Sequence, residues 1–260
     1  PRSLKGSSIP FIPNSIFSLK EKIKGIEGKI AAIIIEPARG TNAPKIYLEA
    51  LKELSKDIGA VLIFDEITSG YRMCPGGIHR IYNVKPDIAV FAKSMANGYA
   101  MAAVIGTENT MNSFQKTFVS STNWTERIGP TAALATLKKY LKYSVHEKLI
   151  NTGNLVKDIW KINAQRHNLK ISISGLPSLC SFSFDSTNSI EMNTYFNISM
   201  LRTGFLGFRQ FKPSFAHSKK DIRKYDDAVN FIFREISNNN NNLKIESDLH
   251  HIGFQRLTKE

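Results

Sequence analysis

Two carboxylates directly follow an apolar segment in the stretch VLIFDEITSGYR, residues 61–72. Asp65 and Glu66 come after four apolar residues that have the composition of a buried strand. Burying an unpaired negative charge is costly, so a carboxylate at the end of such a strand needs a partner. The stretch therefore raises the question of which cation faces Asp65.

Lys93 follows a second apolar segment, in PDIAVFAKS, residues 86–94. Its aliphatic stem is expected to be drawn toward the protein interior, where an ammonium charge is costly. Such a lysine either extends its tip to water or acts as a nucleophile toward an aldehyde. The residue alone does not decide between these two interpretations.

Asp65 and Lys93 are separated by 28 positions, and each lies at the carboxyl end of a predicted strand. Ligands of open α/β sheets bind at this edge, outside the carboxyl ends of the strands. The pair suits pyridoxal 5'-phosphate, which needs an amine for its aldehyde and an acid that keeps its pyridine nitrogen protonated. The cation that faces Asp65 is therefore predicted to be a pyridinium.

The elements that must position these residues follow from the apolar pattern. Near-continuous apolar runs predict strands covered on both faces, and apolar residues at helical spacing predict helices. The expected strands cover 29–37, 60–66, 86–94 and 101–107, and the expected helices cover 15–28 and 41–59. Alternating strands and helices predict right-handed crossovers and a parallel or mixed sheet between helix layers.

The character of the sequence changes near residue 150. The stretch 125–165 predicts helix with a break near Gly153, and shorter elements follow it. The expected later strands cover 170–175 and 180–185, and the expected later helices cover 190–204 and 218–237. We expect two domains, residues 1–150 and 151–260, with an Asn-rich linker near 237–242 in the second.

The composition predicts a soluble globular protein. The chain has 260 residues and a net charge of +13, and no apolar run reaches the roughly 18 residues of a membrane span. Cys74 and Cys180 are too few for a disulfide scaffold, which favours a reducing, cytoplasmic compartment. The basic residues are scattered and no metal-ligand spacing is found. We therefore expect no nucleic-acid partner, no membrane contact and no metal.

Several motifs, in their order along the chain, resemble class III pyridoxal-phosphate aminotransferases. They are AAIIIEP, YLEALKELSKDIGAVLIFDE, SGYR, KPDIAVFAKSMANGYAMAAVIG and PSFAHSKKDIRKYDDAV. The arginine after DEI and the GFQRLT tail are closer to the glutamate-1-semialdehyde 2,1-aminomutase-like branch than to ornithine or GABA transaminases. Those usually read DEVQTG where this chain reads DEITSG. The resemblance covers residues from about 10 to 258.

The resemblance implies an α/β protein of fold-type I. It would hold part of an αβα large domain with a mostly parallel sheet, corresponding to residues 1–150, and a small C-terminal α+β domain. The implied activity is that of an aminotransferase or aminomutase acting on an amino acid or an amino-aldehyde or keto substrate. A cytoplasmic homodimer with sites at the subunit interface is also implied.

The resemblance also implies roles for individual residues. Lys93 would be the catalytic Schiff-base lysine, and Asp65 would contact the pyridine nitrogen. Ile67 would pack against the face of the cofactor ring, in addition to being part of the core. The stretch SSTNWTERIGP would supply a hydroxyl to the cofactor phosphate, commonly that of the partner subunit. Thr122 is the candidate and Ser121 the alternate, because the usual GNP pattern is absent.

Other residues keep alternative interpretations. The resemblance implies that Glu66 is a structural acid. Arg39 and Arg72 could meet a substrate carboxylate, or could be exposed or ion-paired. Chains of the family are usually longer, with a glycine-rich phosphate-binding segment that would precede these residues. We therefore expect the C-terminal portion of a longer enzyme, the alternative being a truncated, inactive interaction module.

Overall fold

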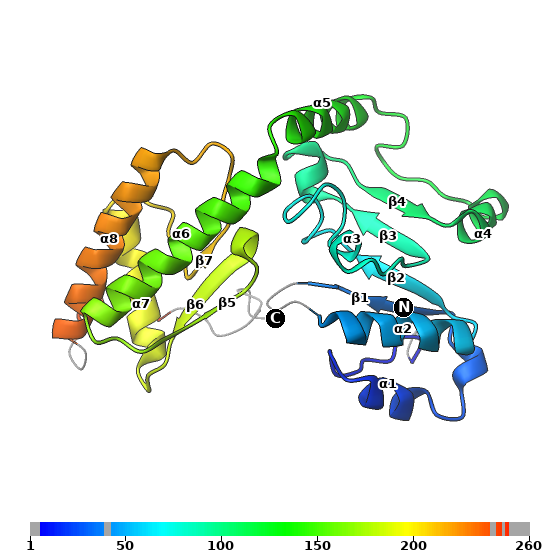
Figure 1. The fold of residues 1–260 in the computed structure, drawn as a ribbon, viewed down its shortest axis with the longest axis horizontal. Helices are drawn as coiled ribbons and strands as arrows, with labels where there is room; N and C mark the ends of the chain where they lie inside the picture. Colours follow the sequence, from blue (N-terminus) through cyan, green and yellow to red (C-terminus); the bar gives the residue numbers. More distant parts are fainter. Residues whose placement is uncertain (1–5, 39–42, 240–242, 246–247, 250–260) are drawn as a thin grey trace. The chain divides into compact units, whose positions relative to one another are not determined.

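The computed structural model describes residues 6–38, 43–239, 243–245 and 248–249. The chain divides into two compact units, Pro1–Glu147 and Lys148–Glu260, which are described one at a time (Figure 1).

The first unit is built on a four-stranded sheet in the order β1-β2-β3-β4. The strands are β1 Ala32–Ile35, β2 Val61–Asp65, β3 Ile88–Phe91 and β4 Ala103–Gly106. The first three are parallel, with Asp65 opposite Val90, whereas β4 runs antiparallel to β3. The predicted mixed, mostly parallel sheet is confirmed, and each strand is shorter than the apolar run that predicted it.

Helices of the first unit connect and cover these strands (Figure 1). The α-helices are α1 Ile16–Ile23, α2 Lys45–Asp57, α3 His79–Tyr82, α4 Glu108–Met111 and α5 Ile128–Lys142. The 3-10 helices are η2 Glu27–Lys29, η3 Lys93–Ala96 and η4 Asn112–Lys116. α1 begins where the Ser15 side chain accepts a hydrogen bond from the amide of Ser18 at 3.1 Å. α5 packs against η3, where Ala133 and Ala96 are buried together.

One of the two buried clusters of the first unit packs between the sheet and the helices α1 and α2. Leu62 and Phe64 of β2 are buried against α1 and α2, together with Ile33 of β1. On the other face Ile34 is 60% exposed. The expectation that these strands are covered on both faces is therefore wrong for β1 within the described residues. α1 and α2 both pack on the face that carries Ile33.

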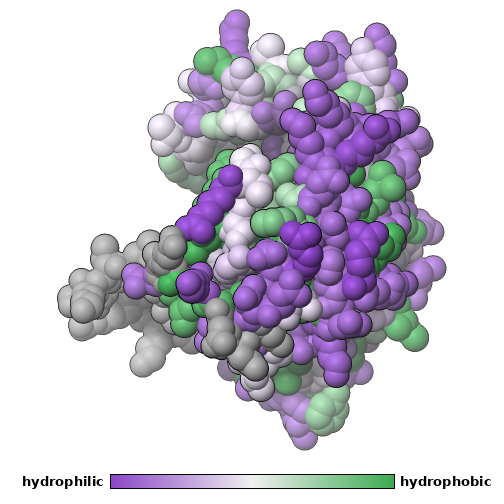
Figure 2. All heavy atoms as spheres, turned by 90° about the vertical axis from the view of Figure 1, so that its left-hand side faces the viewer, coloured by the Kyte–Doolittle hydropathy of each residue, from purple (hydrophilic) through white to green (hydrophobic). Residues whose placement is uncertain are grey.

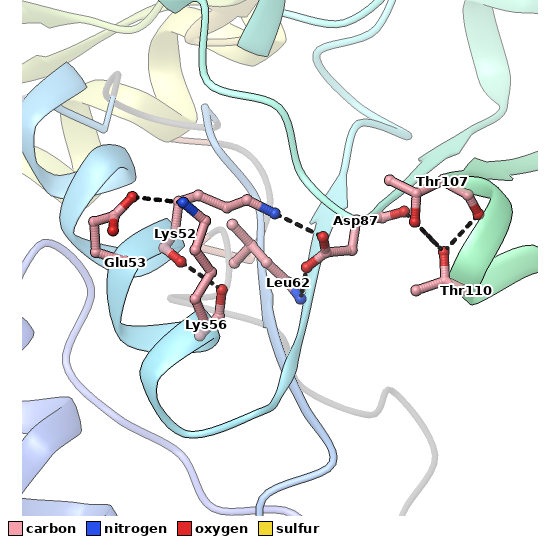
Figure 3. Close-up of polar contacts among 8 residues, drawn as sticks. Lys52, Glu53, Lys56, Leu62, Asp87, Thr107 and Thr110 are labelled. Carbon is pink, nitrogen blue, oxygen red and sulfur yellow. Dashed lines mark hydrogen bonds and ion pairs between the residues drawn. The ribbon is translucent and has the colours of Figure 1, made fainter.

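Asp87 ties the amino end of β3 to three neighbouring elements (Figure 3). Its Oδ1 accepts a hydrogen bond from Nζ of Lys52 in α2 at 2.6 Å, and its Oδ2 accepts one from the Leu62 amide at 2.9 Å. Its carbonyl oxygen accepts from the Thr107 amide at 2.9 Å and from the Thr110 hydroxyl at 3.2 Å. One residue therefore fixes α2, β2 and the end of β4 at the amino end of β3.

The second unit combines a three-stranded antiparallel sheet, in the order β5-β6-β7, with long helices. Its elements are α6 Val145–Arg166, β5 Ile171–Ser174, η5 Pro177–Leu179, β6 Cys180–Phe184, α7 Ser189–Arg202, β7 Gln210–Phe211 and α8 Lys219–Asn238. α6, α7, α8 and β6 share a core rich in aromatic rings, with Trp160, Phe196 and Phe233 fully buried. The predicted α+β character of this part is confirmed.

The helix break predicted near Gly153 lies elsewhere. α5 ends at Lys142 and α6 begins at Val145, after Ser144 with a φ of 42°. Gly153 lies inside α6, where an added Cβ would come within 1.8 Å of the carbonyl oxygen of Pro177. The prediction is therefore wrong. Glycine is needed inside α6 because η5 approaches the helix too closely at this position for a side chain.

α8 is held at its start by a reciprocal capping box. The Ser218 hydroxyl accepts from the Asp221 amide at 3.2 Å, and the Asp221 carboxylate accepts from the Ser218 amide at 2.8 Å.

Figure 2 views the molecule from the side on which α8 lies in Figure 1 and shows a mostly hydrophilic surface. The Asn-rich stretch begins in the last turn of α8, and its residues 240–242 lie outside the described residues. No helix in the described ranges is long and apolar enough to cross a membrane.

Candidate active site

Asp65 and Lys93 lie at the carboxyl ends of neighbouring parallel strands, at the same edge of the sheet. Asp65 is the last residue of β2, opposite Val90 of β3. Lys93 comes two residues after the end of β3 and begins η3. Its Nζ donates a hydrogen bond to Oγ1 of Thr68 at 2.9 Å, and Thr68 lies in the loop that leaves β2. The loops after β2 and β3 are thus joined through the lysine side chain.

Asp65 makes a local hydrogen bond within its own loop. Its Oδ1 accepts from the amide of Ile67 at 3.0 Å, and both residues are half-buried. Within the described part of the chain, no lysine, arginine or histidine nitrogen lies within salt-bridge distance of this carboxylate. It can therefore still take a further hydrogen-bond donor at the carboxyl edge of the sheet.

Lys93 is exposed and has an uncommon backbone conformation. Its φ is 47°, in the left-handed region that residues with a Cβ seldom adopt and that costs about 1–2 kcal/mol. The expectation that its stem is drawn into the interior is wrong in this structure. β3 ends at Phe91 and η3 begins at Lys93, so Lys93 lies beyond the last buried residue of the strand.

Glu66 is fully buried and has a different environment from Asp65. Its carboxylate accepts hydrogen bonds from the Ser69 hydroxyl, the Ile78 amide at 3.0 Å, the His79 amide at 3.1 Å and His79 Nδ1 at 2.9 Å. Burial alone would raise the pKa of Glu66, but the hydrogen bonds from His79, Ser69 and the two amides hold it below its usual value. Glu66 thus acts as a structural acid that closes the loop after β2.

The same loop holds Thr68 in place. Nε of Arg72 donates to the carbonyl oxygen of Thr68 at 2.7 Å, and burial lowers the pKa of this arginine. The Gly70 amide donates to the Glu66 carbonyl at 2.7 Å, and an added Cβ at Gly70 would come within 2.7 Å of both that oxygen and the Phe91 ring. Arg72 therefore braces the loop through its Nε, whereas Arg39 lies outside the described residues.

The hydroxyl candidates for the cofactor phosphate lie in a different segment. Ser121 and Thr122 are exposed in the turn between η4 and α5, and neither is in hydrogen-bond contact with Asp65 or Lys93. Across the described residues, no group of three or more His, Cys, Asp and Glu side chains could hold a metal ion. The chemistry-bearing groups that the structure joins are therefore at the ends of β2 and β3.

Comparison with known families identifies the family of this chain. The family model for "Aminotransferase class-III" matches residues 8–220, well over half of the chain. The chain belongs to the class III aminotransferases. The family predicted from the sequence motifs is thereby confirmed.

Curated relatives of this class III chain include aminotransferases and aminomutases. The 3-aminobutyryl-CoA aminotransferase of Cloacimonas acidaminovorans (strain Evry) is 38% identical over 145 residues, which are 53% of this chain and 35% of that protein. The glutamate-1-semialdehyde 2,1-aminomutase of Chlorobaculum tepidum is 30% identical over 233 residues, which are 81% of this chain and 54% of that protein. Such aminomutases agree with the predicted branch. The chain spans about a third to three-fifths of the length of such relatives.

Solved structures of low sequence identity share the fold of this chain. The FumI protein of Sphingopyxis sp. MTA144, in its PLP internal aldimine form, matches with a TM-score of 0.85 and 21% identity, over 91% of this chain and 59% of that one. A structure described as a transaminase with PLP bound matches with a TM-score of 0.81 and 21% identity, over 92% of this chain and 60% of that one. The expected fold-type I architecture is confirmed.

Two residues of this class III chain were not found from the sequence. Thr68 contacts Lys93, and Asp87 joins three elements at the amino end of β3. The one available signal for Thr68 was a hydroxyl in DEITSG, three residues after Asp65. Asp87 precedes an apolar strand in KPDIAVF, and nothing in that motif specifies its partners.

Proposed function

We propose that this chain supplies the lysine and the aspartate of a pyridoxal 5'-phosphate site in an aminotransferase or aminomutase. The observation that carries the proposal is the position of Asp65 and Lys93 after adjacent parallel strands, with the amine of Lys93 held at the loop that leaves Asp65. When bound, pyridoxal 5'-phosphate supplies an aldehyde carbon that amines attack and a ring that withdraws electrons from the substrate.

The residues present fit this cofactor. Lys93 is exposed, so its amine is open to an aldehyde, and it would act as base and acid that moves a proton at the substrate α-carbon. Asp65 would hold the proton on the pyridine nitrogen with its carboxylate. Ile67 would pack against the ring face, and Thr122 or Ser121 would donate to the phosphate in the partner subunit of a homodimer. The exposure of both hydroxyls leaves them open to such a contact.

The names of the relatives and the two free cysteines support the proposed substrate class and compartment. The substrate would be an amino acid or an amino-aldehyde or keto compound, the class to which the names of the relatives point. Cys74 and Cys180 are free thiols, which suits a cytoplasmic enzyme. Residues 1–150 would form the C-terminal half of the cofactor-binding domain and 151–260 the small domain.

Reductive trapping tests the cofactor assignment directly. The 260-residue protein is mixed with pyridoxal 5'-phosphate, reduced with borohydride, and digested for peptide mass spectrometry. We expect the reduced adduct on Lys93 in preference to other lysines, because its amine is hydrogen-bonded to Thr68 in the loop that leaves Asp65 at the carboxyl edge of the described sheet. Asp65→Asn should weaken the binding of the cofactor and keep the site of attachment.

Two controls make the trapping experiment decisive. Lys93→Ala should remove the selective adduct, whereas Lys116→Ala, at another exposed lysine of the same unit, should leave it unchanged. An adduct spread evenly over the lysines would contradict the assignment. Selective trapping without turnover of any amine donor and keto acceptor would favour the inactive interaction module instead.

A further inference from the structure

We propose that Thr68 is a positioning residue for Lys93: its hydroxyl holds the lysine amine at the edge of the sheet beside Asp65. This inference rests on the proposed function, in which Lys93 is the reacting amine. It goes further by assigning a role to a side chain in the loop after β2, and it can be tested without cofactor.

The contact itself is a short hydrogen bond between side chains of two loops. Nζ of Lys93 lies 2.9 Å from Oγ1 of Thr68, within the usual range for an N–H···O bond. A threonine hydroxyl has lone pairs that accept from an ammonium group, and it carries no charge. It therefore fixes the direction of the amine without adding a second carboxylate next to Asp65.

Thr68 can serve as a fixed point because its loop is braced on both sides. Arg72 Nε binds the Thr68 carbonyl oxygen at 2.7 Å, and Glu66 ties the neighbouring Ser69 hydroxyl to the His79 end of the loop. Thr68 is itself half-buried and β-branched, so few side-chain rotamers are open to it. The orientation of its hydroxyl is thus set before any ligand arrives.

Lys93 is constrained at its backbone as well as at its tip. Its φ of 47° lies in the left-handed region, and such strain concentrates where a structure fixes a functional group. The next turn anchors it, since Met95 and Ala96 of η3 are buried in the cluster that includes Ala133 of α5. A flexible side chain is therefore held at both ends, which lowers the cost of placing its amine for reaction.

The test measures the reactivity of Lys93 in the full chain without pyridoxal 5'-phosphate. Acetic anhydride acylates lysine amines, and peptide mass spectrometry gives the rate at Lys93 relative to exposed Lys138. Because the amine must leave the Thr68 hydroxyl to attack the reagent, Thr68→Val should raise the relative rate about three- to tenfold. Thr68→Ser keeps the acceptor and should stay within about twofold of the wild type.

Thr107→Val is the matched control, since it removes a threonine hydroxyl at the opposite end of the same sheet (Figure 3). It should leave the relative rate at Lys93 unchanged. Thermal unfolding by circular dichroism identifies any variant that fails to fold, and Thr68→Ala then replaces Thr68→Val. Equal rates in Thr68→Val, Thr68→Ser and the wild type would overturn the positioning role. That outcome would not change the trapping result for Lys93. The role of Thr68 and the cofactor assignment are therefore tested independently.

Discussion

Replacement of Asp87 should destabilise the first unit through one buried amide and one ion pair (Figure 3). In Asp87→Ala the amide of Leu62, a residue with 0% exposure, loses its acceptor, and an unsatisfied buried donor costs about 1–3 kcal/mol. The ion pair with Lys52 has side chains that are 21% and 23% exposed, and its loss adds about 1 kcal/mol. The expected loss in free energy of unfolding is therefore about 2–4 kcal/mol.

Two further variants separate these contributions. Asp87→Asn keeps a carbonyl oxygen for the Leu62 amide and loses the charge that faces Lys52, so we expect a loss of about 1 kcal/mol or less. Lys52→Met keeps most of the aliphatic stem and also removes the ion pair, so its expected loss is similar. The ordering of the three variants follows from the structure alone.

The assay combines urea unfolding with amide hydrogen exchange. Urea curves give the free energy of unfolding, and exchange in the peptide that carries Leu62 reports on β2 separately from the second unit. We expect faster exchange at that peptide in Asp87→Ala and near wild-type exchange in Lys52→Met. If Asp87→Ala is no less stable than Lys52→Met, the buried amide is not the dominant contribution and the reasoning fails.

Three other predictions follow from single contacts. Because the folded-state pKa of Glu66 lies below its ordinary value of 4.5, its stabilising effect should be complete above about pH 4.5 and lost as the pH falls further. Glu66→Gln should therefore show a smaller loss of unfolding free energy between pH 5 and pH 3 than the wild type, as measured by urea titration at each pH. Gly153→Ala should lower the stability by about 1–3 kcal/mol, because its methyl group would meet the Pro177 carbonyl; thermal unfolding tests this, with Gly28→Ala as an open-space control. Ser218→Ala should cost about 1 kcal/mol in urea unfolding through loss of the α8 capping box.

The alternating strands and helices were predictable because they depend on local apolar pattern. The run IAAIIIEP and the segment VLIFD give β1 and β2, and the helical spacing between them gives α2. The parallel arrangement followed from the crossover rule. The pattern could not show that one face of β1 is left exposed, because a continuous apolar run does not specify which neighbours cover each face.

The error at Gly153 shows the limit of local reasoning about glycine. A glycine in a helical stretch usually signals a break, since it costs about 1 kcal/mol relative to alanine. Here the helix continues because the missing Cβ admits the Pro177 carbonyl, a contact made by a residue far along the chain. The actual break at Ser144 carries no glycine or proline signal, so no local pattern predicts it.

Asp65 and Glu66 show why neighbouring acids at one strand end acquire different roles. Successive residues of an extended strand point to opposite faces, so the two carboxylates leave β2 in different directions. Glu66 meets the returning loop and receives hydrogen bonds from Ser69, Ile78 and His79. Asp65 receives the Ile67 amide alone among the described residues and stays at the edge where Lys93 is held. The sequence alone does not show which of the two acids is buried and which stays available. The way in which the loop after β2 folds back decides this. A ligand that needs a carboxylate can therefore bind the acid that the loop leaves available.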